Sequence, residues 1–231
     1  MKLIEILEEE DTFAVGEEKL NEILKDKNIS ECLKHYEKNE VFCRYTKAHD
    51  ELIYQVRKEN HPNKRTPTGT SKKSAEIINN FRKKYFPHIA DRLHSVFCWA
   101  AKIEDAFNHL YTAKYFIFPT NKSKLFQSPE VSDIYGDSIY IDALQPYVNA
   151  KDPYTRRHYK EKTLKGLKDY FSEGITKWNE IFFVARHGPH EIYFEYDYYY
   201  AIKIDFIWEL KEKYKKESHN IFSFLIEKSK N

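Results

Sequence analysis

The chain of 231 residues has few cysteines and no long apolar runs. Its three cysteines are scattered, which excludes a disulfide framework and a four-thiolate zinc site. No apolar run approaches the roughly 20 residues that span a bilayer. The first eleven residues alternate apolar and acidic side chains, and they lack the basic region and cleavage site of a signal peptide. We therefore expect a soluble protein of the reducing cytoplasm, with no membrane partner.

Glycine is also scarce, with 6 residues in the whole chain. Neither G-x-G-x-x-G nor G-x-x-x-x-G-K-[ST] occurs, so Rossmann and P-loop nucleotide sites are excluded. The ten histidines are not spaced with cysteines or acids in a recognisable zinc pattern. The sequence therefore predicts no metal site.

The residues that are abundant are apolar, aromatic and charged. Hydrophobic residues make up 41% of the chain and charged residues 32%, a balance typical of globular proteins. The net charge is only +2, but it is segregated: residues 1–40 carry −6 and residues 57–92 carry +7. We predict an acidic helical N-terminal segment over 1–40 and a single α+β domain over 41–231.

The hydrophobic pattern places helices at the ends of the chain and short strands between them. Helical spacing predicts helices over 72–85, 104–111, 154–171 and 206–214. Runs of β-branched and aromatic residues predict strands over 41–45, 115–118, 180–185 and 192–204. This order favours an α+β fold over a regular βαβ repeat.

Three polar residues stand at the edges of predicted apolar strands. Arg44 ends the first of them, and it needs an anionic partner because burial of an unpaired guanidinium is costly. Either a carboxylate of the protein or a ligand phosphate can supply that partner. Ser95 opens a second apolar run. Glu180 begins a third, where a carboxylate can meet developing positive charge.

Arginine, serine and glutamate in this order resemble the R-S-E pattern of the ADP-ribosyltransferases. The segment Phe42-Cys43-Arg44-Tyr45-Thr46 resembles the first-strand element of that family. His94-Ser95-Val96-Phe97 is similar to its serine strand, and Asn179-Glu180-Ile181-Phe182-Phe183 to its glutamate segment. The arrangement is also similar to that of small proteins of large tailed bacteriophages. The resemblance implies a split β-sheet core, with a helical N-terminal segment and a C-terminal helix.

The resemblance also implies an activity and a set of site residues. The substrate would be NAD, and no metal would be needed. ADP-ribose would pass to a host protein or nucleic acid in the host cytoplasm during host takeover. Glu180, Arg44 and Ser95 would be catalytic. The residues implied for binding NAD are Tyr45, Thr46, Phe97, Tyr111 and Tyr115.

The chain departs from the family pattern in three places. The S-T-S element of the family is reduced to Ser95 followed by Val96. Tyr45 stands where the family has a glycine after the first-strand arginine. Trp178 stands two residues before Glu180, where members that modify arginine carry a second acid. These departures leave open another acceptor, NAD hydrolysis, or a fold that binds without catalysis.

A second hypothesis rests on the basic segment 57–92. Its lysines and arginines are interleaved with aromatic residues, which suits contact with a phosphate backbone and stacking on bases. A non-catalytic protein of the phage type could bind nucleic acid or a host enzyme in this way. The residues predicted to dock such a partner, or an acceptor, are Lys64, Arg65, Lys72, Lys73, Arg82 and Lys83.

Overall fold

The computed structural model describes residues 2–45, 51–60, 70–107, 114–129, 131, 134, 137–183, 191–214 and 220–230. The chain forms two compact units. Unit 1 comprises Met1–Asn60, Ala101–Lys122 and Asp197–Asn231, and unit 2 comprises His61–Ala100 and Ser123–Tyr196. Each unit combines helices with antiparallel strands, which confirms the predicted α+β class.

The sheet of unit 1 has the strand order β2-β7-β4-β1, and all of these neighbours are antiparallel. Its inner strand β4 is buried at every position, as expected for a continuous apolar run. The strands are β1 (Glu40–Arg44), β2 (Ile53–Arg57), β4 (Tyr115–Pro119) and β7 (Tyr198–Lys203).

Helices cover one face of this sheet, and Tyr36 is central to the packing. Its ring stacks on Phe118 with centroids 4.4 Å apart, and it meets Phe222 edge-on at 4.8 Å. Its hydroxyl donates to the Ile117 carbonyl at 2.7 Å, so the buried oxygen is satisfied. The helical elements of unit 1 are α1 (Lys2–Leu24), η1 (Lys27–Ile29), α2 (Ser30–Tyr36), α4 (Ile103–Phe107), α7 (Ile204–Lys213) and α8 (Ile221–Lys230).

The predicted N-terminal segment 1–40 supplies part of this packing. Leu20 and Tyr36 are fully buried in unit 1, and α1 contacts α8. The segment therefore contributes to the core of unit 1, and a domain boundary at residue 40 stays a prediction. No helix among the described residues has the length and apolar composition needed to cross a membrane.

The sheet of unit 2 has the order β3-β6-β5, again antiparallel. The strands are β3 (Ser95–Lys102, which belongs to unit 2 as far as Ala100), β5 (Leu125–Gln127) and β6 (Glu191–Glu195). Ser95 pairs with Glu195 at one end of the β3–β6 ladder, and Trp99 pairs with Glu191 at the other.

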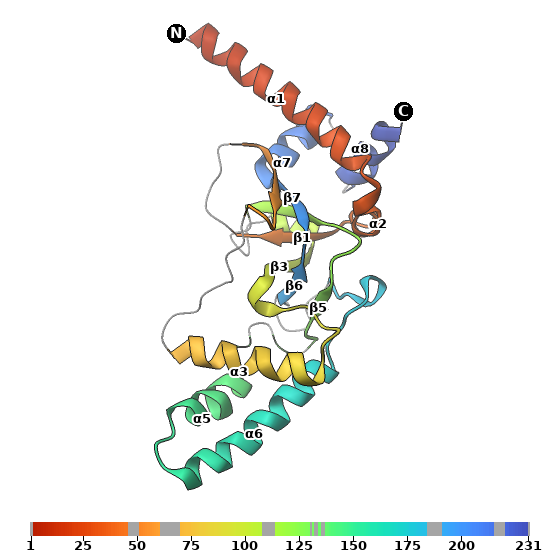
Figure 1. The fold of residues 1–231 in the computed structure, drawn as a ribbon. Helices are drawn as coiled ribbons and strands as arrows, with labels where there is room; N and C mark the ends of the chain where they lie inside the picture. Colours follow the sequence, from red (N-terminus) through yellow and green to blue (C-terminus); the bar gives the residue numbers. More distant parts are fainter. Residues whose placement is uncertain are drawn as a thin grey trace. The chain divides into compact units, whose positions relative to one another are not determined.

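A layer of helices completes unit 2, and Figure 1 shows α3, α5 and α6 side by side. Phe81 of α3 stacks near Phe171 of α6, with centroids 6.2 Å apart. Phe126 of β5 packs against the same Phe171 at 5.7 Å, so one apolar cluster joins this layer to the sheet. The helical elements are α3 (Thr70–Tyr85), η2 (Arg92–His94), η3 (Ile139–Leu144, a π-helix), α5 (Gln145–Asn149), α6 (Pro153–Ser172) and η4 (Trp178–Glu180).

Most predicted elements are confirmed within one or two residues. The strands over 41–45 and 115–118 and the helices over 72–85, 154–171 and 206–214 correspond to β1, β4, α3, α6 and α7. The run 192–204 forms two strands, β6 and β7, and the helix expected over 104–111 is α4 as far as residue 107, beyond which it lies outside the described residues.

The strand predicted over 180–185 is wrong in its described part, residues 180–183. The Phe182 backbone bonds to a side chain there: its N–H donates to Gln127 Oε1 at 2.8 Å, and its carbonyl accepts from Gln127 Nε2 at 2.9 Å. These two bonds occupy the groups that a strand ladder would use. Because the side-chain amide replaces a neighbouring strand, the apolar run stays irregular.

Candidate functional site

Arg44 lies at the end of β1 in unit 1 and is half-buried. Its Nη1 donates to the Tyr199 hydroxyl at 3.2 Å. Among the described residues, no carboxylate pairs with its guanidinium. Of the two partners that the sequence allowed, the internal carboxylate is therefore not found in the described parts of the chain.

Tyrosines surround this arginine on one face of the sheet. Arg44 is directly opposite Tyr115, and paired residues point to the same face. The same alternation places Tyr199 of β7 and Tyr54 of β2 on that face. The Tyr54 and Tyr115 rings meet edge-on at 5.3 Å. Burial raises the pKa of Tyr54, so its hydroxyl stays neutral beside the guanidinium.

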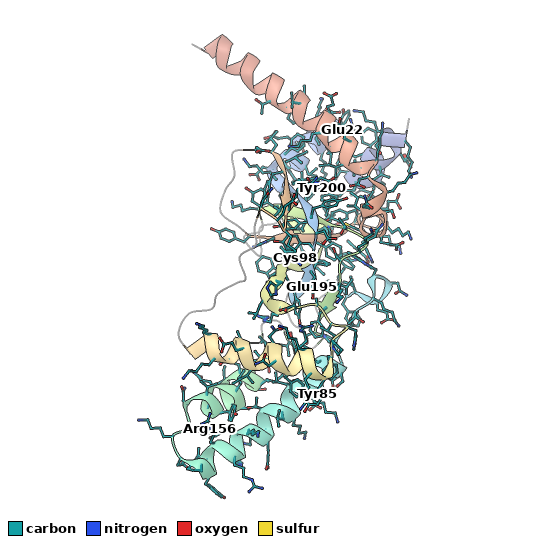
Figure 2. The ribbon with its side chains drawn as sticks, viewed as in Figure 1. Glu22, Tyr85, Cys98, Arg156, Glu195 and Tyr200 are labelled. Carbon is teal, nitrogen blue, oxygen red and sulfur yellow. The ribbon has the colours of Figure 1, made fainter. Side chains whose placement is uncertain are left out.

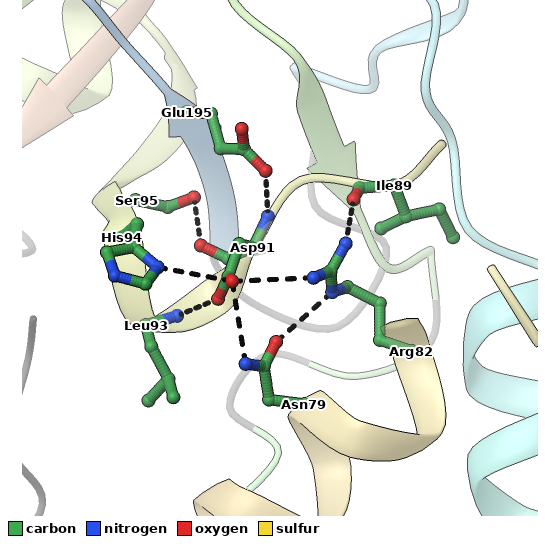
Figure 3. A network of polar contacts seen from close by, with 8 residues as sticks. All are labelled: Asn79, Arg82, Ile89, Asp91, Leu93, His94, Ser95 and Glu195. Atoms are coloured by element: carbon green, nitrogen blue, oxygen red, sulfur yellow. Dashed lines mark hydrogen bonds and ion pairs between the residues drawn. The ribbon is translucent and has the colours of Figure 1, made fainter. Parts of the chain in front are cut away.

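Ser95 lies in unit 2, next to a polar network centred on Asp91 (Figure 3). Ser95 Oγ donates to the Asp91 carbonyl at 2.7 Å, and His94 Nδ1 lies 3.1 Å from Asp91 Oδ2. Glu195 of β6 accepts a hydrogen bond from the Asp91 N–H. The hydroxyl is thus held at the start of β3 by the turn that precedes it.

The Asp91 carboxylate is ionised and firmly held. Burial alone would raise its pKa, but hydrogen bonds from the Leu93 N–H and His94, together with the charge of Arg82, lower it. Arg82 is 5% exposed, and its Nη1 donates to the Ile89 carbonyl at 2.8 Å. Its Nη2 lies 3.4 Å from Asp91 Oδ2. The network ties α3 to the first residues of β3.

Glu180 ends the short η4 turn and does not begin a strand. Its side chain is 48% exposed and pairs with Lys177 at 2.9 Å. The chain enters β6 instead at Glu191, which stands opposite Trp99 of β3. Glu191 is followed by the apolar run Ile192-Tyr193-Phe194, the same sequence signal that singled out Glu180.

The residues implied for binding NAD differ in their accessibility. Tyr45 is 56% exposed just after β1, and Phe97 is half-buried beneath the Arg92 guanidinium at 4.7 Å. Tyr115 is only 1% exposed, so it is a core residue that cannot stack on a ligand without movement. Thr46 and Tyr111 lie outside the described residues.

The predicted docking residues are also of two kinds. Lys72, Lys73 and Lys83 are exposed on α3. Arg82 is buried and engaged by Asp91, which corrects its assignment as a docking residue, because a guanidinium held internally does not face a partner. Lys64 and Arg65 lie outside the described residues.

No alternative metal or ligand centre includes the predicted site residues. Within the described parts of the chain, no three histidine, cysteine, aspartate or glutamate side chains gather closely enough to hold a metal ion. A hollow of about 620 Å³ in unit 1 is lined by residues of α1, α2 and α8, such as Leu24, Leu33 and Ile226, and by none of the predicted site residues.

Comparisons of the chain with protein-family models, with curated proteins and with solved structures found no match.

Proposed function

We propose that the protein is an NAD-dependent ADP-ribosyltransferase of the R-S-E type, which transfers ADP-ribose to a host macromolecule. The observation that carries the proposal is the half-buried Arg44 without a carboxylate partner among the described residues. A guanidinium in this setting is stabilised by an external anion. The diphosphate of NAD supplies that anion with oxygens that suit bidentate binding by arginine.

The proposal keeps Glu180 as the catalytic carboxylate. The bond to be broken joins nicotinamide to ribose, so the acid must be accessible to a bound ligand. Glu180 ends the η4 turn, and its side chain is 48% exposed. Its ion pair with Lys177 is exposed at both ends and therefore contributes little, so the carboxylate is available to a substrate.

The chemistry requires stabilisation of a cation. Cleavage of the nicotinamide–ribose bond passes through an oxocarbenium-like state, as glycoside cleavage does. Nicotinamide leaves with the bonding electron pair as a neutral base, and a nucleophile of the acceptor then bonds to the ribose carbon and loses its proton. The Glu180 carboxylate would stabilise the cation and bind a ribose hydroxyl. One such preorganised group contributes roughly 10²–10³ in rate.

The decisive experiment measures nicotinamide release from NAD by the purified full-length chain, with host lysate as the source of acceptor. Glu180→Gln should lower the rate by roughly 10²-fold or more, the contribution of one charge-stabilising group. Glu173→Gln, which changes another exposed acid of unit 2, is the matched control and should retain the wild-type rate. Circular dichroism confirms that both variants are folded.

Arg44 and Ser95 are tested by the same assay. Arg44→Lys keeps the charge but loses the bidentate geometry, so it should raise KM for NAD more than it lowers kcat. Ser95→Ala should lower kcat with little change in KM. Equal rates for Glu180→Gln and wild type would refute the assignment of the acid. A wild-type protein that releases no nicotinamide in the presence of lysate would refute the function itself.

A further inference from the structure

Helix α6 of unit 2 carries a concentration of positive charge. Its 20 residues include six lysines and arginines, all exposed, against two acids, Glu161 and Asp169. At a rise of 1.5 Å per residue the helix is about 30 Å long, and its basic residues, from 156 to 168, span about 18 Å of that length. The basic residues are Arg156, Arg157, Lys160, Lys162, Lys165 and Lys168.

The basic residues are distributed around the exposed part of α6. Thr163 and Leu167 are buried. Arg157, Lys160 and Lys168 follow one flank at helical spacing, and Lys162 and Lys165 lie on the remaining exposed sides. Arg157 is 3.7 Å from Glu161 in an exposed pair, which contributes little. In the described parts of the chain, Lys160 and Lys168 pair with no carboxylate.

Helix α3 adds charge of the same sign to this layer. Lys72, Lys73, Lys83 and Lys84 are exposed, and Glu76 is the one acid of the helix. Helices α3, α5 and α6 contact one another within unit 2 (Figure 1). The whole chain has a net charge of only +2, so this excess is local and is offset by acids elsewhere.

Exposed aromatic rings accompany the charge. Tyr154, in the first turn of α6, is 86% exposed, and Tyr85, at the end of α3, is 53% exposed. Figure 2 labels Tyr85 and Arg156 on the two helices. Lys84 Nζ lies 4.9 Å from the centre of the Tyr85 ring. Lysines that contact phosphates and rings that stack on bases are the two components of single-strand nucleic-acid recognition.

We propose that the basic surface of α3 and α6 docks single-stranded nucleic acid. Positive charge along about 18 Å of α6, with further lysines on α3, suits a repeating phosphate backbone better than a single small anion. The exposed tyrosines favour unpaired bases over a closed duplex. If the proposed function holds, this surface identifies the acceptor class, because ADP-ribose is then transferred to a nucleic-acid strand bound on these helices. The binding itself is independent of NAD.

The test measures binding of fluorescein-labelled 20-nucleotide dT and rU strands to the full-length chain by anisotropy, without NAD. The triple variant Lys160→Gln, Lys165→Gln, Lys168→Gln should bind at least about tenfold more weakly. The slope of log affinity against log salt should fall by about 2, since each lost phosphate contact on a single strand removes about 0.7. The two strands distinguish DNA from RNA as the preferred ligand.

A matched triple variant in unit 1 removes the same charge from other exposed lysines. Lys25→Gln, Lys38→Gln, Lys122→Gln should bind as the wild type does. Equal weakening by the two triples would overturn the proposal, because net charge alone would then govern binding. Competition by polyglutamate at equal charge concentration would overturn it in favour of an acidic protein partner.

The acceptor assignment has its own readout. With labelled NAD, the wild type should transfer label to the bound strand. The α6 triple variant should transfer at least about tenfold less label at a subsaturating strand concentration. With lysate present, the same variant should release nicotinamide at the wild-type rate. If the wild type binds no strand but still releases nicotinamide, the proposed docking surface is wrong and the transferase stands. Strand binding without any nicotinamide release would refute the transferase and leave the surface supported.

Discussion

Replacement of Glu17 by glutamine should remove the acid-sensitive part of the stability of unit 1. Glu17 lies on α1 and is buried. Its carboxylate accepts a hydrogen bond from Lys213 Nζ of α7 at 2.7 Å. It also accepts hydrogen bonds from Tyr214, directly after α7, and from Lys228 of α8. This one side chain therefore joins α1 to α7 and α8, through lysines that lie 196 and 211 residues further along the chain.

The magnitude follows from the pKa. Burial alone would raise the pKa of Glu17, but hydrogen bonds from Lys213, Lys228 and Tyr214 lower it from 4.5 to about 2. At about 1.4 kcal/mol per unit, this shift corresponds to about 3 kcal/mol of stability for the ionised group, as an upper bound. Because the pKa is lower in the folded state, the contribution is fully present above pH 4.5 and is lost as the pH falls towards 2.

Hydrogen exchange read by mass spectrometry resolves the effect by element. In the wild type, protection of α1, α7 and α8 should fall between pH 7 and pH 3 after correction for the intrinsic exchange rate. In Glu17→Gln the free energy of opening of these helices should be about 2 kcal/mol lower than in the wild type at pH 7. It should fall little further on acidification. Glu22→Gln, on the exposed side of α1, is the control and should follow the wild type. If Glu17→Gln keeps the wild-type pH dependence, the reasoning is refuted.

Two further predictions concern packing and buried charge. Gly174→Ala should lower Tm, because its Cβ would lie 2.0 Å from the Phe126 ring, and overpacking of this kind costs about 1–3 kcal/mol; unchanged Tm would show that the ring moves freely. Arg82→Met should lower the free energy of unfolding, measured in urea, by about 3 kcal/mol, because it leaves the Asp91 carboxylate without its arginine partner. Arg44→Met should change the same quantity by less than about 1 kcal/mol without ligand.

The secondary structure could be predicted wherever a local pattern decides it. The apolar run 115–118 forms a strand because its buried side chains fit the interior of a sheet. Helix α6 begins where Asp152 caps it, with the Thr155 N–H donating to Oδ1 at 2.8 Å. Both signals are contained within a few residues, so no knowledge of the tertiary structure is needed to recognise them.

The run at 180–185 was mistaken for a strand because its composition is the same as that of a strand. The decisive partner is the Gln127 side chain, 55 residues away, which occupies the backbone of Phe182. A pattern in the sequence of one segment cannot report a hydrogen bond to a distant amide. Glu180 and Glu191 each precede an apolar run, and only the tertiary pairing shows that Glu191 begins a strand while Glu180 does not.

The two arginines differ in a way that composition also hides. Arg82 was counted with the exposed bases of its segment, yet Asn79, the Ile89 carbonyl and Asp91 satisfy its guanidinium. Arg44 is half-buried, but its described partner is the neutral hydroxyl of Tyr199. Among the described residues no carboxylate pairs with the Arg44 guanidinium, and the proposed function assigns the diphosphate of NAD to it. The contrast in stability between Arg82→Met and Arg44→Met, measured without NAD, tests this assignment independently of catalysis.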